Sequence, residues 1–239
     1  HDTVRRQRQM CIRDRATTLS LDLWEIDYKN RIEVESAQAI LSSNPNGPSV
    51  TRNEFGDLIG VSTTYFNEEN TFISGIDFQF EHIMEISKGT LSVNIMGTSL
   101  TDFLTPSLNS PNKMINRIGK FNFDNHVHSL PKKRINSFIN WSYKNFVLGF
   151  STRYIDGYKN EREITGLGLT YGYQNTIKSF LVHDISLKAT KGNLSYSVYL
   201  SNLLDKSAPR LYDAPDFSFD TRVHDPRGRI LGLNIGYGF

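Results

Sequence analysis

No run of apolar residues in this 239-residue chain approaches the roughly 18 that a membrane-spanning helix needs. A helical membrane protein is therefore excluded. The mean hydropathy of −0.40 does not exclude a membrane β-barrel, because barrel strands expose only every second side chain to lipid and the average stays as polar as that of a soluble domain. The pattern along the chain has to decide between these classes.

Cysteine is nearly absent too, since Cys11 is the only one, which rules out a disulfide framework and a cysteine-ligated metal site. Even Cys11 stands in a suspect segment. Arg5–Asp14 can be translated back, codon by codon, into a transposon-type sequencing adapter. We therefore interpret residues 1–15 as a translated sequencing-adapter artefact that is not native, and leave them out of fold reasoning. The alternative is a genuine basic arm that binds nucleic acid or an anionic surface.

Net basic charge disappears with that segment. The chain has 27 Lys and Arg against 25 Asp and Glu, and residues 1–15 hold five arginines and only two aspartates. The remainder is almost neutral, so its charge gives no reason to expect nucleic acid as a partner.

From Thr17 onward, large apolar residues recur with a period of two, which is the period of a β-strand. The last segment is the clearest example. One face carries Leu231, Leu233, Ile235, Tyr237 and Phe239, and the other carries Gly232, Asn234, Gly236 and Gly238. This second face is small and polar but almost uncharged, which is typical of a barrel wall that lines a wet lumen.

Tight turns alternate with long polar connections, as they do in outer-membrane barrels. The long connections are 102–132, 157–178 and 204–226. We expect an all-β transmembrane antiparallel barrel fragment of about ten strands, and a short helix at Glu35–Ser43. The expected strands are Thr18–Asn30, Val50–Asn53, 57–66, 72–86, 89–101, 132–143, 145–156, 178–189, 192–203 and 226–239.

Several patches, in order and spacing, resemble those of TonB-dependent receptors. They are Leu21–Ile32, Val50–Asn53, Ser74–Phe78, Ser201–Lys206 with Ala208–Arg210 and Tyr212–Asp213, and Asp225–Arg229. The resemblance implies a 22-stranded barrel of which residues 16–239 form the C-terminal part. The plug domain and the TonB box, through which the receptor meets the TonB complex, are then absent from the chain. Gly232, Ile235, Tyr237 and Phe239 resemble the C-terminal signal that the outer-membrane assembly machinery reads.

The same resemblance implies a function. The parent would lie among the lipids of the outer membrane of a Gram-negative bacterium. It would bind a scarce nutrient (a ferric siderophore, a corrinoid or an oligosaccharide) at its extracellular loops and import it with TonB-transduced energy. The alternatives are a passive porin and a soluble β-rich glycan-binding domain. Candidate ligand contacts in the last long loop are Arg210, Asp213, Asp216 and Arg222, although a solvated loop explains them equally well.

Other polar patterns favour ordinary structural roles. His126 and His128 have the spacing of two metal ligands, but they stand in a polar loop without cysteine. His183–Asp184 and His224–Asp225 could each pair a base with an orienting carboxylate, yet no nucleophile motif accompanies them. We therefore predict no catalytic residue, no resident metal and no cofactor.

Overall fold

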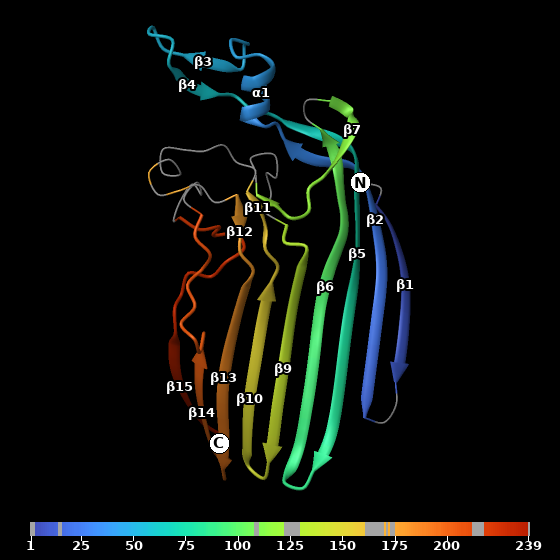
Figure 1. Ribbon diagram of the computed structural model, residues 1–239, viewed down its shortest axis with the longest axis vertical. Helices are drawn as coiled ribbons and strands as arrows, with labels where there is room; N and C mark the ends of the chain where they lie inside the picture. The colour runs from blue at the N-terminus through green and yellow to red at the C-terminus, as the bar shows by residue number, and fades with distance from the viewer. Residues whose placement is uncertain are drawn as a thin grey trace.

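The computed structural model describes residues 3–13, 16–107, 110–121, 130–160, 170, 172, 175–211 and 218–238. No helix in these ranges has the length and apolar surface that crossing a membrane requires. One large antiparallel sheet dominates, with its strands side by side along the long axis (Figure 1). Its order is β1 (Thr3–Arg13), β2 (Thr17–Val34), β5 (Tyr65–Ile86), β6 (Gly89–Ser107), β9 (Lys133–Tyr143), β10 (Phe146–Ile155), β13 (Phe180–Lys191), β14 (Leu194–Ser201) and β15 (Ile230–Tyr237).

One face of this sheet is apolar from strand to strand. Residues directly opposite each other in neighbouring strands point to the same side, and the register places Leu231, Leu200, Ile185, Phe150 and Ile139 in one row. Leu231, Leu233 and Ile235 on β15 are 60–72% exposed. Nothing within the described residues covers this face, so it is the lipid-facing side of a membrane sheet.

The opposite face is small and polar, as the sequence predicted. The neighbouring row runs through Gly232, Tyr199, Ser186, Gly149 and Asn140. A closed barrel encloses this face, and we call it the lumen wall. The large apolar residues thus point away from the enclosed side, which is the opposite of a soluble β-sandwich.

The expected strands Val50–Asn53 and 57–66 are wrong as membrane strands. β3 (Val50–Arg52) and β4 (Leu58–Val61) form a separate two-stranded hairpin beyond the end of β2 and β5, beside helix α1 (Ala37–Ser43) (Figure 1). The short helix was predicted correctly, and the Ser36 hydroxyl accepts a hydrogen bond from the Ala39 amide at its N-terminus.

The strands β2, β5 and β6 contain 18, 22 and 19 residues, about twice the 9–11 that a bilayer needs. The predicted connection 102–132 is therefore partly strand, in β6 itself, in β7 (Ser110–Asn116), which pairs with β6, and in β8 (Lys120–Phe121). β11 (Tyr158–Asn160) pairs with β8 and with β12 (Thr176–Ile177). The loop end of the sheet is thus built up well beyond the membrane.

A small core holds this loop end together. Among the described residues, the buried large apolar side chains are Tyr158, Ile177, Phe180, Val182 and Leu211. All five belong to the loops or to the adjoining end of β13. The membrane sheet has no comparable core of its own, because its apolar side chains face lipid.

Candidate functional site

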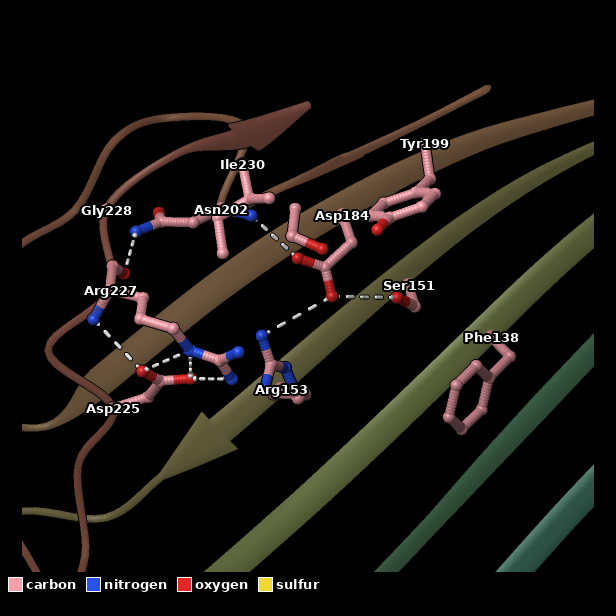
Figure 2. Close-up of a pocket in the computed structure, with 11 residues that line it drawn as sticks. Phe138, Ser151, Arg153, Asp184, Tyr199, Asn202, Asp225, Arg227, Gly228 and Ile230 are labelled. Carbon is pink, nitrogen blue, oxygen red and sulfur yellow. Dashed lines mark hydrogen bonds and ion pairs between the residues drawn. The ribbon is translucent and has the colours of Figure 1, made fainter. Parts of the chain in front are cut away.

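A cavity of about 390 Å³ lies on the lumen wall where β10, β13 and β14 meet the last loop (Figure 2). Charged and polar side chains share its lining with aromatic and aliphatic ones. The lining side chains that carry the argument are Ser151, Arg153, Asp184, Asn202, Asp225 and Arg227. A smaller cavity of about 100 Å³ shares four of these residues and continues toward Phe180 and Val223.

Asp184 contacts three other residues of this site. Its carboxylate accepts hydrogen bonds from the backbone N–H of Asn202 at 2.7 Å and from the Ser151 hydroxyl at 3.4 Å. The Arg153 guanidinium stands 3.5 Å away. The strand alternation explains its position, because Asp184 is cross-strand partner to Ser151 and shares its face. Asp184 therefore lies on the lumen wall.

Two of the sequence patches, far apart in the chain, meet at the same place. The Asn202 side chain donates to the backbone oxygen of Lys206 at 2.9 Å and to that of Arg227 at 3.4 Å. The Asp205 carboxylate accepts the Arg229 amide at 2.8 Å. Ser201–Lys206 and Asp225–Arg229 therefore form one hydrogen-bonded corner that carries the last loop into β15.

A bidentate ion pair between Arg227 and Asp225 lies in the same corner. The Arg227 guanidinium lies 2.6 Å from the Asp225 carboxylate and holds the pKa of that carboxyl at about 2. Asp225 is thus ionised at any physiological pH. Arg227 remains 71% exposed on its side chain and Arg153 48%, so each guanidinium keeps donors that can meet an anionic or hydroxylated group in the lumen.

The two histidine–carboxylate sequence pairs, to which we assign structural roles, do not act as paired side chains. His183 and Asp184 are consecutive on β13 and point to opposite faces. The His183 ring stacks on Phe150 and contacts the Thr152 hydroxyl at 2.9 Å. Asp184, on the lumen wall, therefore cannot orient it.

His224 belongs to the loop core instead. It is 4% exposed, stacks on Tyr158 and meets the edge of Phe180. Burial lowers its pKa to about 4, against the nearby carboxylate of Asp220. The Asp220 carboxylate accepts the Tyr158 hydroxyl at 2.7 Å. A neutral, buried imidazole fits a packing role.

The predicted loop contacts are only partly described. Arg210 is exposed and precedes the fully buried Leu211. Arg222 is exposed in a turn that the Asp220 carboxylate caps. The loop residues Asp213 and Asp216, the terminal Phe239 and the histidines His126 and His128 lie outside the described residues. Elsewhere, no three His, Cys, Asp or Glu side chains are grouped to hold a metal ion.

Of the predicted assembly signal, Ile235 and Tyr237 lie on the lipid side, 60% and 57% exposed. Gly232 lies on the lumen wall against the ring of Tyr199, and an added Cβ would come within 2.0 Å of that ring. The structure therefore gives Gly232 a local packing role. Whether assembly machinery reads these residues stays a prediction.

Sequence reasoning did not single out Arg153, Asn202 or Arg227 as site residues. Arg153 had a usable signal, because it shares the lumen parity of Ser151 in a strand that is otherwise uncharged. Asn202 and Arg227 were quoted only as parts of patches. That these patches touch depends on how a loop of more than twenty residues returns, which periodicity cannot show.

Comparison with known proteins fits this architecture. The family model described as "TonB dependent receptor-like, beta-barrel" matches residues 10–203, which is most of the chain. The chain belongs to the TonB-dependent receptor family. No curated protein sequence matches it.

Solved structures of TonB-dependent receptors share the fold. A ferric enterobactin receptor, PfeA, from Pseudomonas aeruginosa aligns over 99% of this chain and 31% of its own, at 14% identity and a TM-score of 0.63. The ferric yersiniabactin uptake receptor FyuA from Yersinia pestis aligns over 99% and 30%, at 15% identity and a TM-score of 0.58. The FrpB iron transporter from Neisseria meningitidis aligns over 98% of this chain and 31% of its own, at 10% identity and a TM-score of 0.56. This chain thus spans about a third of the length of the solved receptors, and its sheet is an unclosed part of such a barrel.

Proposed function

We propose that the protein containing this chain is an active-transport receptor of the Gram-negative outer membrane. It would bind a scarce nutrient at its extracellular loops and import it with energy from the TonB complex. The observation that carries the proposal is the sheet itself, with an apolar outer face and a polar lumen wall, in a chain whose family consists of transporters.

The substrate class proposed first is a ferric siderophore, with a corrinoid or an oligosaccharide as the other candidates. Two observations support this order. The similar receptors PfeA and FyuA are named for ferric enterobactin and ferric yersiniabactin. On the lumen wall, Arg153 and Arg227 present guanidinium donors beside the cavity, and such donors suit the anionic oxygens of a chelate.

The experiment is uptake of radiolabelled iron by cells that carry the complete parent gene and lack their other ferric-siderophore receptors. We expect saturable uptake of one ferric chelate that disappears when TonB is deleted. Arg153→Gln should weaken uptake several-fold, whereas Lys178→Gln, on the exposed link before β13, is the matched control and should not. Uptake that persists without TonB would identify a passive porin, and TonB-dependent growth on a glycan alone would move the substrate to the oligosaccharides.

We also propose that residues 1–15 are not native, and that the plug domain and TonB box belong to parts of the parent beyond this chain. The position of Arg8 supports the first point. Arg8 pairs with Leu23 on the lipid side of the sheet, a face on which charged side chains are unfavourable. Sequencing the uninterrupted parent gene tests this, and an in-frame Arg5–Asp14 in that gene would contradict it.

A further inference from the structure

Three successive tight turns lie at the end of the sheet away from the long loops (Figure 1), and each carries a lysine. The turns join β5 to β6, β9 to β10 and β13 to β14. Their lysines are Lys88, Lys144 and Lys191, all exposed. In an outer-membrane barrel this end faces the periplasm, so the three ammonium groups lie at the level of the periplasmic leaflet.

Hydrogen bonds fix the three turns relative to one another. The Trp141 indole donates to the Lys88 carbonyl at 2.7 Å, which ties the first turn to β9. The Asn145 side chain donates to the Thr190 carbonyl at 2.7 Å, and the Thr190 amide donates back to the Asn145 carbonyl at 3.0 Å. The lysines are therefore carried on one connected rim.

Aromatic side chains lie directly beneath that rim on the lipid face. Trp141 and Tyr143 stack with ring centroids 5.9 Å apart, and the Lys144 ammonium stands 5.3 Å from the centre of the Tyr143 ring. Phe146, partner of Tyr143, and Tyr196 continue the band on neighbouring strands. Such rings occupy the interface between acyl chains and headgroups.

Lys144 occupies a backbone position that favours glycine. Its φ is 53°, in the left-handed region, and the matching first position of the next two-residue turn is Gly192 with a φ of 58°. A side chain there costs about 1 kcal/mol or more relative to glycine. A lysine retained at such a position points to a use for its charge.

Charge is also sorted between the two faces at this end. Glu85 and Lys188 lie on the lumen wall by register, opposite Thr90 and Val147. Glu85 accepts the Thr90 hydroxyl at 3.1 Å. In the described part of the chain, Lys88, Lys144 and Lys191 form no ion pair. The turns and the lipid side thus carry unbalanced positive charge.

We propose that Lys88, Lys144 and Lys191, above the Trp141–Tyr143 pair, form a binding site for the headgroup of an anionic phospholipid in the periplasmic leaflet. The aromatic rings would contact the glycerol and upper acyl region, and the nearest ammonium group the phosphate. The other two lysines, on turns two strands apart in the sheet, would add to the positive potential along the rim. The site needs only the membrane orientation of the sheet, so it stands or falls separately from the transported substrate.

The test is native mass spectrometry of the complete receptor in a mild nonionic detergent. It is titrated with phosphatidylglycerol or with phosphatidylcholine of the same acyl chains. Phosphatidylglycerol should bind more tightly. Lys144→Gly should weaken it about fivefold, as expected for one lysine near an anionic lipid, and should leave folding intact because Gly192 fills the same turn position. The triple variant Lys88→Ser, Lys144→Gly and Lys191→Ser should weaken phosphatidylglycerol binding about a hundredfold.

Lys188→Ser is the matched control, since it removes one lysine from the same end of β13 but on the lumen wall. It should leave phosphatidylglycerol binding unchanged. If Lys144→Gly fails to fold, Lys191→Ser alone should still lower binding. Equal binding of the two lipids, an unaffected triple variant, or an equal loss in Lys188→Ser would each overturn the proposal.

Discussion

A lysine placed on the lipid face should destabilise the receptor far more than a lysine placed one residue further along β15. Leu233 is 68% exposed on the lipid side, and Asn234, opposite Ser197, lies on the lumen wall. The 8 residues of β15 rise about 3.3 Å each, and at a tilt near 40° they cover about 20 Å of a roughly 25 Å apolar band. Leu233, at the middle of the strand, therefore lies near the bilayer centre.

At that depth Leu233→Lys should cost about 2–4 kcal/mol, while Asn234→Lys should change stability by less than about 1 kcal/mol. The measurement is reversible urea unfolding of the complete receptor in lipid vesicles, followed by tryptophan fluorescence. Leu233→Met, which keeps the side chain apolar, is the control for a change of shape at this position. A larger loss for Asn234→Lys than for Leu233→Lys would mean that the two faces are assigned the wrong way round, and the transporter interpretation would fail with them.

Three further predictions concern the Gly232 contact, the buried His224 and the open edges of the sheet. Gly232→Val should destabilise the receptor by about 1–3 kcal/mol because its Cβ would enter the Tyr199 ring. Adding Tyr199→Ala should recover part of this loss in the same unfolding assay, and a double variant no better than the single one would contradict the contact. The pKa of His224 is lowered from 6.5 to about 4 in the folded loop. As the pH falls, this histidine therefore takes up a proton in the unfolded loop before it does so in the folded one. The stability of the loop core should then be complete above about pH 6.5 and fall as the pH drops toward 4. Limited proteolysis near pH 7 and about pH 4.5 measures this, and His224→Phe should abolish the difference; cleavage that is independent of pH in the unmodified protein would contradict it. The chain 16–239 alone should not form a heat-modifiable pore in reconstituted membranes, because the edges of an unclosed sheet leave N–H and C=O groups that lipid cannot satisfy; a heat-modifiable band would show otherwise.

The membrane strands could be predicted because a single constraint shapes them. Lipid on one side and water on the other force a period of two along every strand. The alternation in the sequence therefore predicted that Leu231, Leu233 and Ile235 face lipid, and the register confirms it. The same reasoning failed at Val50–Arg52 and Leu58–Val61. Apolar residues in a short hairpin above the membrane look like a short membrane strand, and periodicity contains no information on depth.

The lumen site was less accessible from the sequence. Asp184 could be assigned to the lumen by parity alone. Its contacts with Asn202 and Arg153 depend on the register between β10, β13 and β14, and the arrival of Arg227 depends on the path of a loop. The loop core is similar, because Tyr158, Ile177 and Leu211 come from three separate segments, each with too few apolar residues to form a recognisable pattern.

The sheet and the loop core bury their apolar side chains in different ways, the sheet against lipid and the loop core against other protein groups. In the sheet, side chains such as Leu231 and Ile235 lose contact with water only when lipid covers them, so the sheet's hydrophobic stabilisation exists only in the membrane. The loop core around Leu211, which is 0% exposed, is dry without lipid. The loop core can therefore keep its packing where no bilayer reaches. This packing, which needs no lipid, can keep the polar wall with Asp184 and Arg227 ordered at the loop end of the sheet.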